Sequence, residues 1–135
     1  MSRRATLYYG SQNSASSANT MRFERPKISC TSAAVSDIGL SRGRNEDSFR
    51  CDDKLGAWMV CDGVGGHKRG DVASRTAVEA ASAYLQIRQR QLRQIGITKN
   101  VRRLAEIAQS AVLVANHEVR RLAQTSRENA GMGCT

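Results

Sequence analysis

Two short β-compatible runs and two longer periodic segments divide the chain into predicted strands and helices. Residues 47–52 and 56–62 lie on either side of an Asp-Asp-Lys turn, a pattern that predicts a β-hairpin. Residues 28–39 are small and β-compatible and end in the turn-forming sequence Ser-Asp-Ile-Gly, which predicts one further strand. The first half of the chain is therefore expected to contribute three strands.

The hydrophobic period changes after residue 70. Apolar residues then recur at spacings of three and four, which is the period of an amphipathic helix. One helix is predicted over residues 70–93, with Asp71 as its cap and Gly96 as its stop, and a second over residues 101–125. The apolar stripe of each helix indicates a face that packs in the core rather than a binding groove.

The two ends of the sequence depart from these patterns. Residues 1–27 include a run of Ser, Asn, Gln, Ala and Thr with little to bury. This run predicts a disordered tail or a miscalled start, with Met21 as the alternative first residue. The last five residues, Gly-Met-Gly-Cys-Thr, begin a β-like or turn-like segment and then stop. We therefore expect residues 28–135 to form one domain that is truncated at its C-terminal end.

Composition narrows the class of protein. The 135 residues are 40% hydrophobic and only 4% aromatic, so one small domain with a core of alanine, valine and leucine is expected. The net charge of +9, from 21 Lys and Arg against 12 Asp and Glu, favours anionic partners such as phosphoproteins or nucleic acid. The basic residues are scattered, however, and no aromatic residues interleave with them, which argues against a dedicated nucleic-acid-binding protein.

Cysteine and hydropathy patterns bear on location. The four cysteines include no Cys-x-x-Cys pair, so reduced thiols in a cytoplasmic protein are expected. No apolar run approaches the roughly 18 residues that a membrane span needs. The basic first residues are not followed by the apolar segment of a secretory signal. We therefore predict a cytoplasmic protein without a membrane partner.

The densest chemical signal follows the apolar run 57–60. This run leads to Asp62 and Gly63 and then to a glycine-rich turn that contains His67. Carboxylate oxygens at the end of a buried strand suit Mg²⁺ or Mn²⁺, and Asp62 with the carbonyl of Gly63 could hold a pair of ions that activates a water. The alternative is an Asp-Gly hairpin turn. That alternative fits less well, because a helical pattern follows and four of residues 63–70 are glycine.

Two acidic residues precede this segment. Glu46 and Asp47 are neighbours, so on an extended strand they face opposite sides and at most one shares the cavity of Asp62. Glu46 is the better candidate for contact with the water shell of a metal. Asp47 either orients the loop or a second water, or belongs to a solvated acidic turn.

Basic residues on both sides of the carboxylates are candidates for phosphate chemistry. Arg42 could donate a planar pair of hydrogen bonds to a phosphate, with Arg44 as a competitor that spacing alone does not separate. His67 could donate a proton to a leaving alkoxide, because the free pKa of histidine lies near neutrality. The alternative for His67 is a structural histidine at the entry to a helix.

Four pieces of sequence, taken in order, resemble the opening third to half of the metal-dependent type 2C (PPM) protein serine/threonine phosphatase family in its bacterial form. They are residues 36–39, 42–47, 62–67 with 70–74, and 131–135. The resemblance implies an α+β fold, here an incomplete α-β-β-α sandwich of antiparallel sheets flanked by helices, with a two-metal cleft for Mn²⁺ or Mg²⁺. It also implies hydrolysis of phosphoserine and phosphothreonine in proteins by a metal-activated water, with a Ser/Thr kinase as counterpart.

The resemblance further implies roles for individual residues. By their places in the motifs, Arg42 is similar to the family's phosphate-binding arginine and His67 to its proposed general acid. Glu46 is similar to the acidic residue that reaches a metal through water. Asp62 is similar to the metal-bridging aspartate, and Gly63 to the residue that supplies a carbonyl ligand.

The sequence also departs from the family pattern. The family's other metal-binding aspartates belong to later motifs that residues 1–135 do not contain, and Cys134 stands where threonine is usual. Two divalent ions need more negative charge than one bridging carboxylate to stay bound. We therefore expect the chain alone to have little or no phosphatase activity. The alternatives are a remnant of a disrupted gene and a non-catalytic module that binds phosphoproteins.

Overall fold

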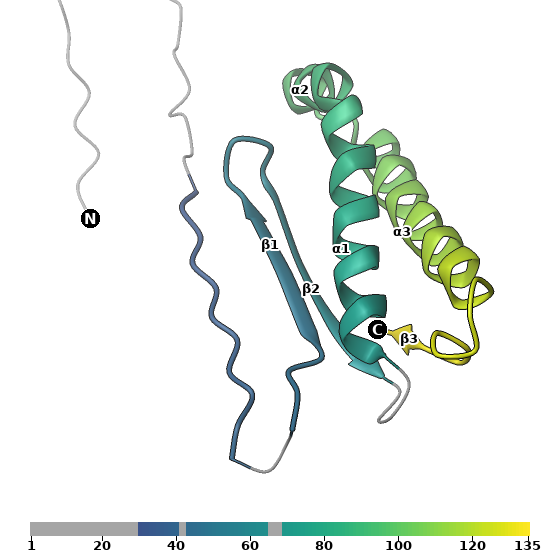
Figure 1. Ribbon diagram of the computed structural model, residues 1–135. Helices are drawn as coiled ribbons and strands as arrows, with labels where there is room; N and C mark the ends of the chain where they lie inside the picture. Colours follow the sequence, from purple (N-terminus) through teal and green to yellow (C-terminus); the bar gives the residue numbers. More distant parts are fainter. Residues whose placement is uncertain (1–29, 41–42, 65–68) are drawn as a thin grey trace, which may run out of the picture.

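The computed structural model describes residues 30–40, 43–64 and 69–135. Its elements are β1 (Asp47–Asp52), β2 (Ala57–Val64), α1 (Gly70–Ile87), α2 (Gln89–Thr98), α3 (Val101–Ala123) and β3 (Gly133–Cys134). The strands form one antiparallel sheet in the order β1-β2-β3 (Figure 1). The tail predicted at residues 1–27, with Met21 in it, lies outside the described residues.

The predicted hairpin is confirmed, since β1 pairs with β2 along its whole length. Asp52 closes the turn: its carboxylate accepts a hydrogen bond from the Leu55 N–H at 2.9 Å, and its carbonyl accepts one from the Gly56 N–H at 2.8 Å. Gly56 has a φ of 70°, a left-handed conformation that glycine adopts without a steric penalty. The glycine therefore allows the chain to enter β2 directly after the turn.

The prediction of a strand at residues 28–39 is wrong for residues 30–39, the part that the structure describes, because these residues form no strand. This segment contacts the hairpin turn and the loop before β1 through hydrogen bonds that each involve a side chain. Ser32 donates hydrogen bonds to the Asp53 carboxylate, and the Ser36 hydroxyl accepts one from Asn45 Nδ2 at 2.8 Å. The serines and alanines of the segment offer little area to pack against a neighbouring strand, so a β-compatible composition does not suffice.

The start of the first helix is confirmed, but its cap is not the predicted one. α1 begins at Gly70, and its N-cap residue is Arg69 in a left-handed conformation with a φ of 62°. No side chain caps this end, and Asp71 lies in the first turn instead. There its carboxylate still interacts favourably with the positive end of the helix dipole.

The prediction of one helix that runs to residue 93 and is stopped by Gly96 is wrong. The helix breaks at Arg88 and continues as α2, which contains Gly96. The chain reverses at Lys99, whose φ is 53°. The side chain of Asn100 then caps α3 by accepting a backbone hydrogen bond at 3.0 Å, and the helix predicted at residues 101–125 is confirmed to within two residues.

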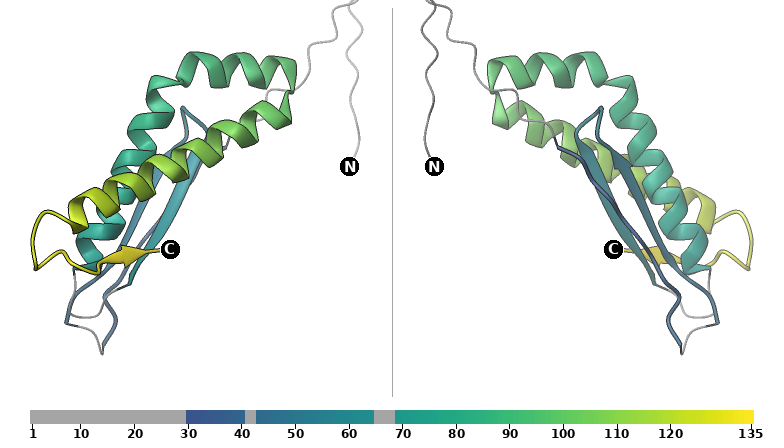
Figure 2. Two further views of the ribbon diagram at one scale, coloured as in Figure 1. Left: turned by 90° about the vertical axis from the view of Figure 1, so that its right-hand side faces the viewer. Right: turned by 90° about the vertical axis from the view of Figure 1, so that its left-hand side faces the viewer.

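The sheet, α1 and α3 pack as three successive layers (Figures 1 and 2). α1 packs against β1 and β2, and α3 packs against α1. The predicted α+β fold, with a partial antiparallel sheet, is confirmed. The core consists mainly of small aliphatic side chains, as the composition predicted: Cys61, Val72, Ala73, Ala77, Val78, Ala81, Ala111, Ala115, Val119 and Met132.

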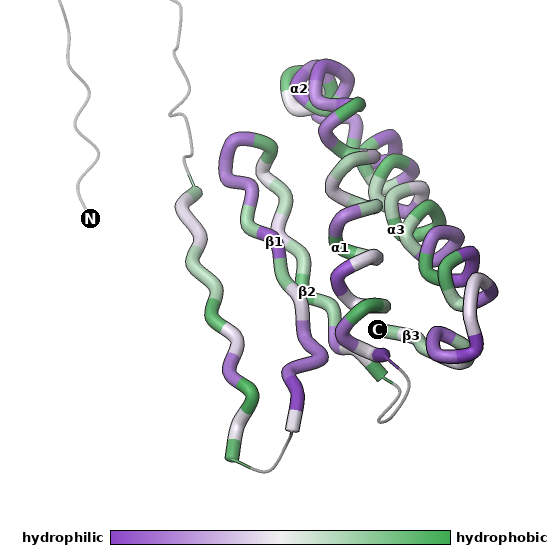
Figure 3. Tube along the Cα trace, viewed as in Figure 1, coloured by the Kyte–Doolittle hydropathy of each residue, from purple (hydrophilic) through white to green (hydrophobic). Residues whose placement is uncertain are grey.

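The face of the sheet turned away from α1 is apolar and exposed. Side chains alternate along β2, so Cys61 faces the core while Trp58, Val60 and Val64 face outward and are 45%, 81% and 48% exposed. Phe49 of β1 lies opposite Val60 on the same face. Hydrophobic residues recur along β2 and along α3 (Figure 3). None of the described helices has both the length and the apolar character required to cross a membrane.

Candidate functional site

The carboxylates predicted from the sequence lie where β1 begins and β2 ends. The hairpin register places Asp47 directly opposite Asp62, and opposite residues of an antiparallel pair share one face of the sheet. Because Asp62 alternates with the core residue Cys61, both carboxylates project from the outer face, where both residues are exposed. The register therefore brings Asp47, rather than Glu46, beside Asp62.

Glu46 packs against the start of α1. Its carbonyl accepts a hydrogen bond from the Gly63 N–H at 3.0 Å. Its carboxylate lies so close to the first helical residue that a Cβ placed on Gly70 would be 3.0 Å from Oε2. The first amides of a helix carry a partial positive charge, so they attract a carboxylate in this position.

Gly63 is required by packing, independently of any role as a ligand. A Cβ at this position would overlap the backbone carbonyls of both Gly70 and Glu46. Three backbone segments meet there: the loop before β1, the end of β2 and the first turn of α1. Glycine is needed at this position because the backbones approach one another closely. The sequence pattern did not reveal this requirement.

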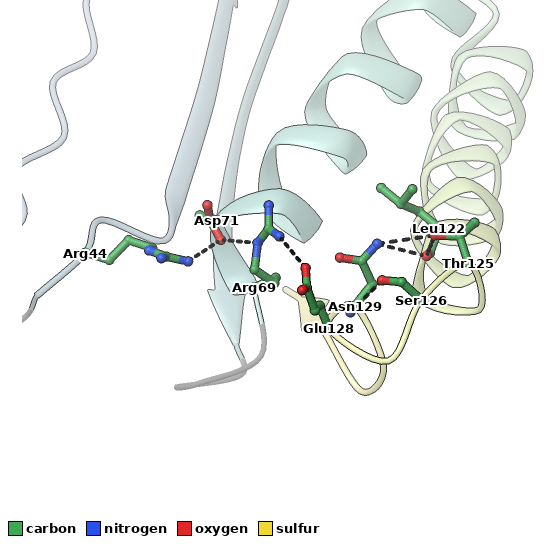
Figure 4. Close-up of polar contacts among 8 residues, drawn as sticks. All are labelled: Arg44, Arg69, Asp71, Leu122, Thr125, Ser126, Glu128 and Asn129. Atoms are coloured by element: carbon green, nitrogen blue, oxygen red, sulfur yellow. Dashed lines mark hydrogen bonds and ion pairs between the residues drawn. The ribbon is translucent and has the colours of Figure 1, made fainter.

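A chain of ion pairs surrounds this junction (Figure 4). Arg44 Nη1 lies 3.2 Å from Asp71 Oδ1, and Arg69 Nε lies 3.8 Å from the same oxygen. Arg69 Nη1 lies 3.8 Å from Glu128 Oε2. Partly exposed pairs contribute little stability, so these contacts show where the loop before β1, the start of α1 and the segment after α3 meet, and they do not by themselves hold the three segments together. Sequence spacing gave no sign of Arg69 or Glu128, because the two residues meet only in the folded chain.

Of the two arginines that are candidate phosphate ligands, Arg44 lies within the described residues. Arg44 is already paired with Asp71, and an arginine that neutralises a carboxylate has fewer donors left for a phosphate. The other candidate, Arg42, lies outside the described residues, and so does His67. Arg44 therefore has a structural contact within the part of the chain that the structure describes.

The thiol of Cys61 lies on the core side of the strand, next to Asp62. Burial raises the pKa of Cys61 to about 12, with further contributions from the neighbouring Cys134 and from the charges of Asp62 and Asp47. A thiol with so high a pKa stays neutral near pH 7 and is a poor nucleophile. The raised pKa of Cys61 therefore argues against covalent chemistry carried by this thiol.

Asp47 and Asp62 provide oxygen donors of the kind that Mg²⁺ and Mn²⁺ bind. In the part of the chain that the structure describes, no three His, Cys, Asp or Glu side chains are close enough to hold an ion together. The donor set thus fits the type of ion, and the pair supplies part of a coordination sphere. A complete site requires further ligands.

Comparison with known proteins identifies the family of the chain. The sequence model of the family described as Protein phosphatase 2C matches residues 41–134, more than two thirds of the chain. The matched segment contains Asp47 and Asp62 and ends within β3. Among curated proteins, no sequence matches the chain significantly.

Proposed function

Because the chain belongs to the protein phosphatase 2C family, we propose that it forms the opening part of a domain that removes phosphate from phosphoserine and phosphothreonine in proteins. The observation that supports this function best is the pairing of Asp47 with Asp62 at the end of the hairpin. Two carboxylates on one face of a sheet provide the negative charge that divalent ions require.

In this proposal Mn²⁺ or Mg²⁺ is held by Asp62 and the carbonyl of Gly63, with Glu46 and Asp47 contacting the ions through water. Bound ions supply activation of a water and stabilisation of the charge that develops on the phosphate. The chain's own contribution is rigidity. The pairing of Asp47 with Asp62 and the close contact at Gly63 support this role, because they hold the backbone of the proposed donors.

Arg42 and His67 act on the substrate side in this proposal. Arg42 binds the phosphate, because the competing Arg44 is paired with Asp71. His67 protonates the oxygen of the departing serine or threonine. Both roles rest on the positions of these residues in the motifs. The substrates are phosphorylated proteins, the counterpart is a Ser/Thr kinase, and the location is the cytoplasm.

The division of the chain is part of the same proposal. Residues 1–27 form a tail, and residues 28–135 form the N-terminal part of a phosphatase domain whose metal site is incomplete, so the activity of the chain alone is low. A module that binds phosphoproteins without hydrolysing them, or the remnant of a disrupted gene, is the competing interpretation. A phosphothreonine peptide separates these functions, because a low but measurable release of inorganic phosphate in the presence of Mn²⁺, lost in Asp62→Asn, is expected only for the first one.

Metal binding at the paired carboxylates is tested by titrating Mn²⁺ into the isotopically labelled chain and following the amide resonances. The paramagnetic ion should broaden residues near Asp47 and Asp62 first. Asp62→Asn should weaken binding at least about tenfold, because a bridging charge is lost. Glu106→Gln is the matched control, since Glu106 pairs with Arg103 on the surface of α3. Equal broadening in Asp62→Asn and Glu106→Gln would refute the site.

A further inference from the structure

α2 lies at the end of the molecule opposite to β3 (Figures 1 and 2). Its inner side carries Ile95, which is 7% exposed, and its exposed residues include Arg90, Gln94 and Ile97. These three follow one another at spacings of four and three, so they share one face of the helix. Ile97 is 82% exposed there. This outer face of α2 therefore combines an arginine and a glutamine with a large aliphatic side chain.

The outer face of α2 is turned away from the space between the sheet and the helices. A cavity of about 840 Å³ is lined there by the hairpin turn, β2 and the three helices. α2 contributes residues such as Leu92 and Ile95 to this lining, but not Arg90, Gln94 or Ile97. A strand that extended β3 along β2 would run through this cavity. The exposure of the outer face therefore does not depend on what occupies that space.

The charge around α2 has a single sign. Between Glu79 and Glu106 the sequence contains no acidic residue and six basic ones: Arg88, Arg90, Arg93, Lys99, Arg102 and Arg103. Two of these, Arg102 and Arg103, share Glu106 at 3.5 and 2.8 Å. The salt bridges among the described residues leave the other four without a carboxylate partner. Such a concentration of positive charge attracts an anionic surface.

An exposed isoleucine among arginines distinguishes between anionic partners. Single-stranded nucleic acid stacks its bases on aromatic side chains, and residues 85–105 contain no aromatic residue. An acidic peptide binds best in a groove, whereas Arg90 and Ile97 lie on the outside of a helix. An anionic bilayer accommodates both side chains, because the arginine head reaches the lipid phosphates and the isoleucine enters the apolar layer below them.

We propose that the outer face of α2 docks on an anionic phospholipid surface, with Arg90 at the level of the phosphates and Ile97 inserted below them. Ile87, the last residue of α1, is 81% exposed directly before α2 and adds apolar area at this end. A helix that lies on a membrane needs less apolar length than one that crosses it, so a search of the sequence for spanning segments does not detect it. This docking does not depend on phosphatase chemistry.

The probes are vesicles of pure phosphatidylcholine and vesicles that also contain phosphatidylglycerol, with binding measured by co-sedimentation. We expect binding to the anionic vesicles that weakens at high salt, because salt screens the charges. Arg90→Gln should weaken it about fivefold, the effect of one basic residue near an anionic surface. Ile97→Gln should weaken it about tenfold, because apolar burial is lost. Arg75→Gln and Leu113→Gln, at exposed positions of α1 and α3, are the matched controls and should change it less than about twofold.

Insertion of residue 97 is measured separately. Trp58 is the only tryptophan of the chain, so in Trp58→Phe/Ile97→Trp the fluorescence comes from position 97 alone and should shift to shorter wavelength on anionic vesicles. If Arg90→Gln or Ile97→Gln fails to fold by circular dichroism, this shift still decides the question. No binding to anionic vesicles, or equal affinities of these variants and their controls, would overturn the proposal. Binding of an oligonucleotide or of polyglutamate that Arg90→Gln weakens and Ile97→Gln does not, without the shift on vesicles, would overturn it in favour of a polyanion site.

Discussion

Gly63 lies where three backbone segments meet, and a methyl group there would overlap the carbonyls of Gly70 and Glu46. Because backbone atoms cannot rotate away, Gly63→Ala should lower the free energy of unfolding by about 3 kcal/mol. Gly96→Ala is the matched control: a Cβ there meets nothing within 4 Å, and alanine favours the helix by about 0.5–1 kcal/mol. Urea unfolding followed by circular dichroism measures both variants. A Gly63→Ala chain as stable as Gly96→Ala would contradict the packing at this junction.

At the same scale, the sequence predicted the candidate site only in part. Asp62 and Gly63 are visible in the sequence because a carboxylate and a glycine at the end of an apolar run form a local pattern. The choice between Glu46 and Asp47 is not local. Neighbouring residues of a strand face opposite sides, and only the register with β2 decides which one shares a face with Asp62. The spacing of the carboxylates along the chain does not by itself specify this register.

Among the elements, β1 is tied to α1 by a hydrogen bond between the hydroxyls of Ser48 and Ser74 at 3.0 Å, and Ser74 is fully buried. Ser74→Ala leaves the Ser48 hydroxyl without this partner and should lower the free energy of unfolding by about 1–2 kcal/mol. The double variant Ser48→Ala/Ser74→Ala should lose less free energy of unfolding than the two single variants lose in sum. Ser110→Ala, which removes an exposed bond on α3, should change stability little. Additive effects of the two core variants in thermal unfolding would show that the hydroxyls do not interact.

The elements that the sequence predicted well are those that local patterns specify. The hairpin has an acidic turn between two matched runs, and α3 has a capping Asn100 before a long apolar stripe. The failures are elements that depend on contacts. A strand at residues 28–39 needs a neighbour to pair with, and the described part of this segment is joined to the hairpin turn and the loop before β1 only by hydrogen bonds that each involve a side chain. Gly96 is accommodated within α2 because the reversal is made by Lys99.

At the scale of the whole molecule, the exposure of the outer face of the sheet follows from the order in which the layers pack. α1 covers a single face of the sheet, and α3 packs on α1. The apolar outer residues therefore remain exposed, Val60 most of all at 81%. The composition predicted a core of small aliphatic side chains but contained no information about which faces would be covered. That depends on how the layers stack.

The stacked layers share one core cluster, which joins β2, α1, α3 and the segment before β3 through residues such as Val119 and Met132. Val119 is 6% exposed, so Val119→Ala should lower the free energy of unfolding by about 2 kcal/mol. Because the cluster is shared, the urea midpoint should fall equally for Trp58 fluorescence, which reports on the sheet, and for the helical circular dichroism signal. Val112→Ala, at a position 67% exposed, should shift neither. If Val119→Ala moved the helical signal alone, α3 would unfold separately from the sheet, and the layers would be independent units rather than one cooperative fold.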